Sequence, residues 1–315
     1  RNTRVLYPTC ALYPISKTPV DQKTREEYAK HIKENYDKQS AVYSATYTGD
    51  GRYPTGHHRL QVTLAMIDQL AKKPNVMLDA GCGDGRMVAE LVKKGYNCKG
   101  FDVSDGMIEV GKRILKDNGL AEDLIWVGDI YKMPAEDHSV DLLLALGVLE
   151  NLDDHEALFN EFRRVLAPGG RVIFSVDNQL FSLFSFNKHT VKFYKSFFDS
   201  YDVPQDAQEE VLRELASWLK VDDVQTIDRI IGDHQIKKNH NDIPQYNRLS
   251  CDPELRKFGW ATERLRFYHV HPLPPRFESK YPELFRGFAE KLETSDYDWR
   301  SSLFCNCMLV QAHIE

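Results

Sequence analysis

The sequence predicts an α/β fold in which a mostly parallel sheet is covered by helices on both faces. Between residues 76 and 177, five short apolar segments that we expect to be strands alternate with helical stretches. This order is typical of parallel sheets, because two neighbouring parallel strands need a crossover connection that is usually a helix. A helical segment precedes the alternation, and an aromatic-rich insertion and two late strands follow it.

The individual elements follow from the spacing of apolar residues and from the turn residues between them. Helices are expected over residues 24–39, 60–73, 86–94, 105–117, 155–166, 211–219 and 281–293. Strands are expected over residues 76–79, 98–102, 124–128, 140–146, 171–176, 264–271 and 307–313. We divide the chain into an N-terminal cap (1–59), a core (60–177), a lid inserted after the fifth strand (178–260) and a last segment whose two strands complete the core (261–315).

Composition narrows the class of protein. The formal net charge of −6 disfavours a nucleic-acid partner, since phosphate binding usually requires an excess of Lys and Arg. The apolar runs are too short to span a bilayer, and no signal-peptide pattern opens the sequence, so we expect no membrane partner. The 6 cysteines are scattered, which favours reduced thiols and therefore a cytoplasmic location.

The most informative segment is Val76-Met77-Leu78-Asp79-Ala80-Gly81-Cys82-Gly83-Asp84-Gly85. Here a buried strand ends beside a carboxylate and enters a turn with glycine at alternate positions, which lets a bulky ligand approach the main chain closely. Dinucleotide-binding loops have the spacing G-x-G-x-x-G, so the third glycine comes one residue early. Asp79 would also repel a pyrophosphate, whereas it suits a ligand that carries an ammonium, such as S-adenosylmethionine.

The ends of the next three strands carry residues that suit the rest of this ligand. Asp102 ends the second strand, where a carboxylate can accept hydrogen bonds from two vicinal ribose hydroxyls. Asp129 follows the third strand, where it can accept from an adenine amino group. Backbone carbonyls around Leu146, at the end of the fourth strand, can hold an ammonium. With their neighbours, the expected cofactor-binding residues are Asp79, Gly81, Gly83, Asp102, Val103, Met107, Asp129, Ile130 and Leu146.

Together these motifs resemble the class I S-adenosylmethionine-dependent methyltransferase superfamily, in particular its ubiquinone-biosynthesis, type 11-like members. The resemblance covers roughly residues 60–177 and rests on residues 78–85, 102, 128–129, 147–152 and 166–170. It implies a Rossmann-like, seven-stranded, mostly parallel sheet whose last strand is antiparallel, with N-terminal helices and a helical lid after strand five. It also implies that S-adenosylmethionine lies over the carboxyl ends of the strands and that a methyl group passes to an N, O or S atom of a small polar metabolite.

Residues outside the cofactor core are expected to shape the acceptor pocket. The expected substrate-binding residues are Tyr36, Tyr43, His57, Glu150 and Asn151. Methyl transfer by in-line displacement depends mainly on positioning the acceptor, so not every acceptor needs a general base. The candidate bases are His57, expected in a loop, and His240, His269 and His271; His57 is preferred. Many relatives carry His where Asn151 stands, which removes one further candidate.

Alternative functions remain at this point. Asp177 and Asn178 resemble half of the metal site of catechol-type O-methyltransferases, but no acid stands at the end of strand four, so no metal is expected. An RNA or protein methyltransferase is the main alternative, against which stand the acidic balance and the absence of an Asn/Asp-Pro-Pro-Tyr/Phe motif. A non-catalytic cofactor-binding subunit is disfavoured by the intact motif residues, and an oxidoreductase by the glycine spacing. The acceptor atom, the use of a base, the oligomeric state and the pathway stay open.

Overall fold

The structure is a computed structural model that describes residues 22–40, 43, 47, 54–152, 154–200, 203–221, 227–228, 245–246, 251–292 and 299–315. Among these residues, no helix is long and apolar enough to cross a membrane. His240, one of the candidate bases, lies outside the described residues.

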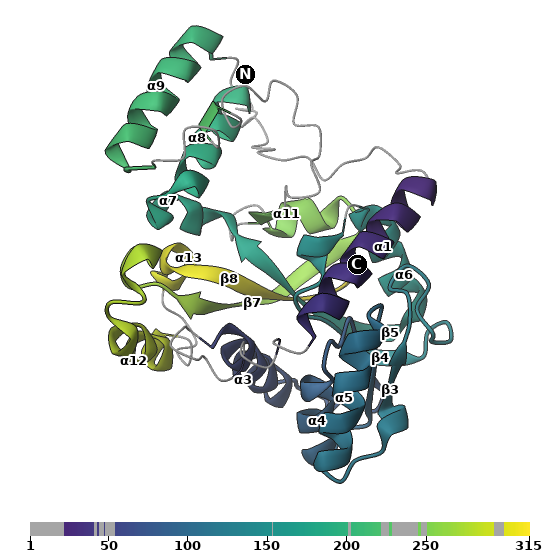
Figure 1. Cartoon of the computed structure of the whole chain (residues 1–315). Coiled ribbons are helices and arrows are strands. Elements are labelled where there is room, and N and C mark those ends of the chain that lie inside the picture. The colour runs from purple at the N-terminus through teal and green to yellow at the C-terminus, as the bar shows by residue number, and fades with distance from the viewer. Residues whose placement is uncertain are drawn as a thin grey trace, which may run out of the picture.

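A mixed sheet forms the centre of the molecule (Figure 1). Its strands follow the order β3-β2-β1-β4-β5-β8-β7. Their bounds are β1 Met77–Ala80, β2 Cys98–Asp102, β3 Ile125–Val127, β4 Val140–Ala145, β5 Leu166–Asn178, β7 Trp260–Val270 and β8 Cys305–Ile314. Strands β1 to β5 pair in parallel, whereas β8 runs antiparallel to both β5 and β7. The predicted seven-stranded sheet is therefore confirmed, with one addition: the short strand β6 (Gln245–Tyr246) pairs with the end of β5.

Helices cover both faces of the sheet and complete three layers (Figure 1). One face packs against α3 (Thr55–Asp68), α4 (Arg86–Lys93) and α5 (Asp105–Asp117). The other packs against α6 (His155–Val165) and α11 (Cys251–Arg256). Successive strand residues point to opposite faces, so Leu143 joins one core while Leu142 and Leu144 join the other. Because both faces are buried, the strands are nearly continuous apolar runs.

Several elements begin earlier than the sequence predicted, and two of them, β5 and α3, bear on the site. β5 begins at Leu166 instead of Arg171, and a register shift between Val140 and Leu142 accommodates the additional residues. α3 begins at Thr55 instead of Leu60. Its first turn carries polar His57 and His58, so the apolar periodicity that marks the rest of the helix is missing there. The expected loop position of His57 is therefore wrong: it lies in a helix.

The insertion after β5 forms helices that stand apart from the sheet. These are α7 (Ser182–Ser185), α8 (Lys188–Ser200) and α9 (Gln205–Trp218), of which α9 lies farthest from the sheet in Figure 1. Val191, Leu212 and Ala216 are buried in a small hydrophobic cluster of the insertion, with Phe198 packed against it. A ring contact of 5.5 Å between Phe184 and Phe304 connects the insertion to α13 (Ser301–Phe304).

Asn178, at the end of β5, joins the insertion to the last two strands. Its buried side-chain amide donates to the carbonyls of Ser302 and Cys305, both at 2.8 Å, and its oxygen accepts from the N–H of Leu180 at 3.3 Å. One side chain thereby satisfies backbone groups where β5, α13 and β8 meet, and where irregular backbone has few other partners.

Replacing Asn178 by Ala should lower the free energy of unfolding by about 2–4 kcal/mol, because two buried carbonyls lose this donor. Urea denaturation followed by circular dichroism measures the change. The matched control is Asn118→Ala, in which an exposed amide that donates to the carbonyl of Ile114 at 2.7 Å is removed. The control should cost less than about 1 kcal/mol, and an equal cost for the two variants would contradict the prediction.

Candidate active site

Glycines in a left-handed backbone conformation shape the turn after β1. Gly81 and Gly83 have φ of 79° and 54°, which residues with a Cβ rarely adopt. A Cβ at Gly81 would also collide with the side chain of Val148. The N–H groups of Gly81 and Cys82 both donate to the carbonyl of Phe101, at 2.8 and 2.9 Å. The turn is therefore fixed against the neighbouring strand β2.

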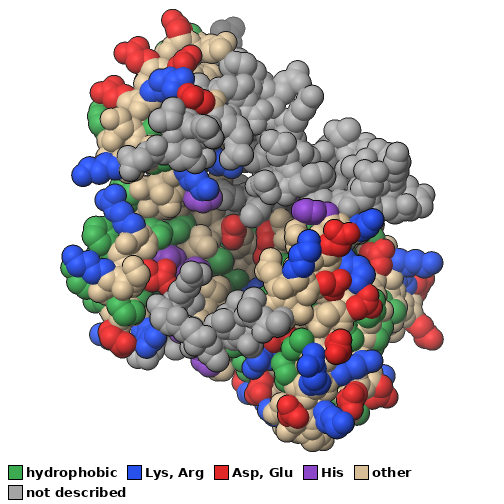
Figure 2. All heavy atoms as spheres, viewed as in Figure 1, with side chains coloured by type: hydrophobic (Ala, Val, Ile, Leu, Met, Phe, Trp, Pro, Cys, Tyr) green, Lys and Arg blue, Asp and Glu red, His purple; other side chains and the backbone are tan. Residues whose placement is uncertain are grey.

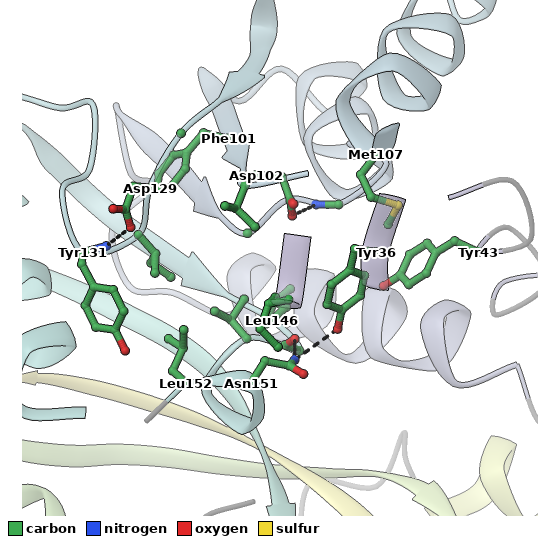
Figure 3. Close-up of a pocket in the computed structure, with 18 residues that line it drawn as sticks. Tyr36, Tyr43, Phe101, Asp102, Met107, Asp129, Tyr131, Leu146, Asn151 and Leu152 are labelled. Atoms are coloured by element: carbon green, nitrogen blue, oxygen red, sulfur yellow. Dashed lines mark hydrogen bonds between the residues drawn. The ribbon is translucent and has the colours of Figure 1, made fainter. Parts of the chain in front are cut away.

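An open pocket lies over this turn and the carboxyl ends of β1, β2 and β4 (Figure 3). The predicted cofactor-binding residues that line it are Gly81, Gly83, Asp102, Val103, Met107, Asp129, Ile130 and Leu146. Tyr36, Tyr43 and Asn151 of the predicted substrate-binding residues also line it. The fold thus brings most of the predicted site together in one cavity.

The carboxylate of Asp102 connects the glycine turn to β2. One oxygen accepts from the N–H of Gly83 at 2.9 Å (Figure 3). The other accepts from the N–H of Ser104, also at 2.9 Å. Each carboxylate oxygen has a further lone pair for a ligand in the pocket. Burial raises the pKa of Asp102, and its backbone N–H donors oppose this shift. The side chain therefore holds the turn in shape and still presents acceptors to the cavity.

The far end of the pocket is apolar and opens to solvent. Phe101, Ile130 and Leu152 line it, and a flat ring could pack between such side chains. Asp129 is exposed at the mouth and accepts from the N–H of Tyr131 at 2.9 Å (Figure 3). This combination of an apolar slot and a carboxylate at its rim can hold an aromatic base through its faces and through an amino group.

A smaller pocket continues from the other side of the turn and contains opposite charges. Asp79, the remaining predicted cofactor residue, lines it together with Arg59 and Leu146. Asp79 is 2% exposed, and its Oδ1 has no hydrogen-bond partner among the described residues. Burial raises the pKa of Asp79 to about 7, although the nearby guanidinium of Arg59 opposes this. A cationic ligand would stabilise the charged form of this buried carboxylate, because an unpaired buried charge is costly in free energy.

Arg59 is a functional candidate that the sequence analysis expected only as part of the N-terminal cap (1–59), without an individual role. Its Nη2 donates to the hydroxyl of Tyr43 at 3.3 Å, and no carboxylate of the described part of the chain lies within ion-pair distance of it. Arg59 and Asp79 offer a cation and an anion to the same small pocket, which suits a ligand that carries both an ammonium and a carboxylate. The signal in the sequence was an arginine directly before the apolar face of α3.

Helix α1 (Gln22–Gln39) docks against the start of α5 and brings Tyr36 to the pocket. Asp37 accepts from the hydroxyl of Ser104 at 2.6 Å and from the N–H of Gly106 at 3.0 Å. A carboxylate is favourable at a helix N-terminus, where backbone N–H groups lack partners. Residues from two distant parts of the chain therefore meet at one edge of the pocket, which no short sequence motif announces.

Tyr36 and Asn151 contact each other across the pocket wall (Figure 3). The side-chain amide of Asn151 donates to the hydroxyl of Tyr36 at 3.1 Å and to the carbonyl of Gly147 at 3.0 Å. The N–H of Gly147 in turn donates to the hydroxyl of Ser175 at 2.6 Å. Asn151 thus fixes the turn after β4 and presents no basic atom to the pocket.

Glu150 lies behind this wall and is not among the residues that line either pocket. Its Oε2 is buried without a hydrogen-bond partner among the described residues. Burial and the charge of Asp177 raise the pKa of Glu150 to about 7. Its predicted contact with substrate stays a prediction, since reaching the cavity from here would require the side chain to move.

The histidine candidates lie at the other side of the smaller pocket. His57 is exposed in the first turn of α3, with its ring 5.7 Å from that of His58, and lines neither pocket. At the end of β7, burial lowers the pKa of His269 well below its usual value and that of His271 to about 4. Both rings are therefore neutral at physiological pH. None of the three described histidines is brought to the wall of the larger pocket.

Comparison with known proteins agrees with this geometry. Residues 78–174 match the family described as "Methyltransferase domain". Over 110 residues, the chain is 36% identical to norajmaline N-methyltransferase of Rauvolfia serpentina, covering 34% of this chain and 38% of that protein. Over 216 residues, it is 26% identical to a probable chloroplastic tocopherol O-methyltransferase of Oryza sativa subsp. japonica, covering 61% of this chain and 60% of that protein. The matches thus span at most about three fifths of these two relatives.

The fold is shared with a solved enzyme over nearly the whole chain. Magnesium protoporphyrin IX methyltransferase from Synechocystis PCC 6803, solved with bound S-adenosylhomocysteine, superposes with a TM-score of 0.52 at 14% sequence identity. The superposition covers 91% of this chain and 100% of that one. Residues 78–174 of this protein thus match a methyltransferase domain, and the chain shares the fold of that solved enzyme.

Replacing Gly147 by Ala tests the close approach of Arg59 to the turn after β4. Gly147 has φ of 77°, and a Cβ there would collide with the Arg59 guanidinium. The control is Gly95→Ala, at φ of 79° with no atom within 4 Å of the new Cβ. We expect the control to cost about 1–2 kcal/mol through its backbone alone. Gly147→Ala should cost about 1 kcal/mol more, because the end of the Arg59 side chain has to move away from the new Cβ.

Thermal and urea unfolding of the two variants measures this difference. If Gly147→Ala and Gly95→Ala lose the same free energy, Arg59 does not occupy the position described here.

Proposed function

We propose that this protein is an S-adenosylmethionine-dependent methyltransferase that acts on a small polar metabolite. The observation that carries the proposal is the distribution of charged groups on the two sides of the glycine turn. Asp102 lines the larger pocket, and Asp79 and Arg59 line the smaller pocket beside it. A carboxylate suits the two hydroxyls of a ribose, and a carboxylate with a guanidinium suits the ammonium and carboxylate of an amino acid.

The residues present fit this cofactor at each of its parts. The unpartnered Oδ1 of Asp79 would accept from the ammonium, and Arg59 would pair with the carboxylate. Asp102 would accept from the ribose hydroxyls, while Val103 and Met107 would contact the sugar. Gly81 and Gly83, which have no Cβ, would let the ligand lie against the main chain. The aromatic base would pack on Ile130, with Asp129 as acceptor for its amino group.

The chain itself has to position the acceptor and exclude water. The cofactor, when bound, supplies a methyl group on a sulfonium, which is an excellent leaving group. Tyr36, Tyr43 and Asn151 line the same cavity and would orient the acceptor there. Their hydroxyl and amide groups are polar and uncharged near neutral pH, which suits a polar metabolite. Since Asn151 carries no basic atom, this wall supplies no general base, and His57 stays a predicted base.

Two observations support a small acceptor. The relative from Rauvolfia is named as an N-methyltransferase of norajmaline. The relative from rice is named as a probable O-methyltransferase of tocopherol. On the face shown in Figure 2, acidic and basic side chains are interspersed over the region of α4 and α5, whereas a polyanion would favour a continuous basic surface. A cytoplasmic location stays a prediction, and the rice relative is described as chloroplastic.

Calorimetry with the purified chain tests the cofactor. We expect S-adenosylmethionine and S-adenosylhomocysteine to bind, and NAD not to bind. A transfer assay with methyl-labelled S-adenosylmethionine and pooled polar metabolites then identifies the acceptor by the mass of the product. Binding of NAD without S-adenosylmethionine would refute the proposal. Labelling of RNA or protein and of no metabolite would leave the cofactor in place and overturn the small-molecule acceptor.

Replacing Asp102 by Ala should weaken S-adenosylmethionine binding by about 1–3 kcal/mol, because acceptors for the ribose are lost. This corresponds to an increase in Kd of roughly 5- to 150-fold, measured by calorimetry. The variant also loses two hydrogen bonds to backbone N–H groups, so a control with the same structural loss is needed.

Asp141 provides that control. Its Oδ2 accepts from the N–H groups of Asn75 and Val76 at 2.8 and 3.0 Å, at the amino ends of β1 and β4 and therefore at the opposite edge of the sheet. Asp141→Ala should lower stability and leave the Kd unchanged. An unchanged Kd in Asp102→Ala would show that this carboxylate does not contact the cofactor.

A further inference from the structure

Three potential metal ligands gather at the carboxyl end of β7. The side chains of His269, His271 and Glu278 each offer one ligand atom, and these atoms all lie within 4.8 Å of one another. His269 lies in β7, and His271 directly follows this strand. Glu278 directly follows the short helix η4 (Pro275–Phe277). The loop between them therefore folds back and returns a carboxylate to the two imidazoles.

The sheet topology places this cluster at the cofactor edge of the molecule. β8 is antiparallel to β5, and β7 is antiparallel to β8, so β7 runs in the same direction as β1 to β5. Its carboxyl end thus lies at the edge where the glycine turn lies. His58, one residue before Arg59, is close enough to His269 for their charges to interact. The cluster is consequently a neighbour of the smaller pocket and shares no residue with it.

Packing holds the two rings in place. The ring of His271 stacks on that of Phe181 at 4.8 Å and meets Phe285 of α12 (Pro282–Leu292) edge-on at 5.6 Å. The ring of His269 lies 4.4 Å from that of His271. His269 has φ of 60°, a conformation that costs free energy for a residue with a Cβ. The surrounding contacts therefore maintain a local arrangement that the strand alone would not adopt.

His271 also has an unused ligand atom. The residue is 5% exposed, and its Nδ1 is buried without a hydrogen-bond partner among the described residues. A buried polar nitrogen left in this condition costs free energy, because it has lost its hydrogen bonds to water. A metal ion bound to this nitrogen would remove that cost.

We propose that His269, His271 and Glu278 bind a divalent transition-metal ion, for which Zn²⁺ is the best match. Two imidazoles and a carboxylate are ligands that Zn²⁺ and its first-row neighbours accept, whereas Mg²⁺ and Ca²⁺ prefer oxygen. Ligand atoms within 4.8 Å of one another need only small side-chain movements to reach Zn–N and Zn–O distances of about 2.0–2.2 Å. Three protein ligands leave a coordination position for water or for an acceptor atom.

Calorimetry of the tag-free chain, freed of metal by a chelator and then titrated with Zn²⁺, tests the site. We expect binding of one equivalent. Glu278→Gln keeps the shape of a half-buried side chain and removes the charge, and should raise the Kd at least about tenfold. His271→Gln should do the same. Co²⁺ in place of Zn²⁺ should give the spectrum of a site with nitrogen and oxygen ligands and no thiolate charge-transfer band.

The matched control is His313→Gln, which removes a histidine whose Nδ1 lies 3.2 Å from a carboxylate oxygen of Glu263 on the same sheet. Its Zn²⁺ affinity should equal that of the unchanged chain. The proposal is overturned by less than one equivalent of Zn²⁺, by a thiolate band, or by unchanged affinity in Glu278→Gln. If His271→Gln does not fold, Glu278→Gln decides alone. Because no cofactor is present in these titrations, their failure leaves the proposed methyl transfer untouched.

Discussion

The carboxylate of Asp102 is the interaction on which the arrangement of the site depends. By accepting from the N–H groups of Gly83 and Ser104, it joins the turn after β1 to the turn after β2. The same Ser104 caps α5 by accepting from Met107 and donates to Asp37 of α1. These connected hydrogen bonds thus fix the floor of the cavity, the helix α5 beside it and the helix α1 that covers it.

The two pockets beside these hydrogen bonds differ in the charged groups that line them. The larger pocket has acceptors at one end and an apolar slot at the other, and the smaller pocket has a buried carboxylate opposite a guanidinium. Burial strengthens these electrostatic differences, because the low local dielectric makes an unmatched charge costly. A ligand that supplies the missing partners therefore stabilises the folded state as it binds.

The insertion and the last two strands bring side chains from outside the core to the edge of the sheet where the glycine turn lies. Asn178 connects β5 to the backbone at the start of β8, and the strands beyond it bring β7 alongside. As a result, the imidazoles at the end of β7 lie at the same edge as the cofactor core, although they are far from it in the sequence.

The sequence by itself indicated the alternation of strands and helices, the glycine turn and most of the residues that line the larger pocket. These depend on local patterns: apolar runs, glycines that must adopt positive φ, and carboxylates at strand ends, which parallel strands gather at one edge. The start of α3 at Thr55 escaped prediction because its first turn lacks apolar residues. The role of Arg59, the contact between Tyr36 and Asn151, and the meeting of Glu278 with two histidines were decided only by tertiary structure. Each of these contacts joins residues that are far apart in the sequence, where no repeating pattern of residue types predicts a contact. Packing of the whole molecule determines which of these residues become neighbours.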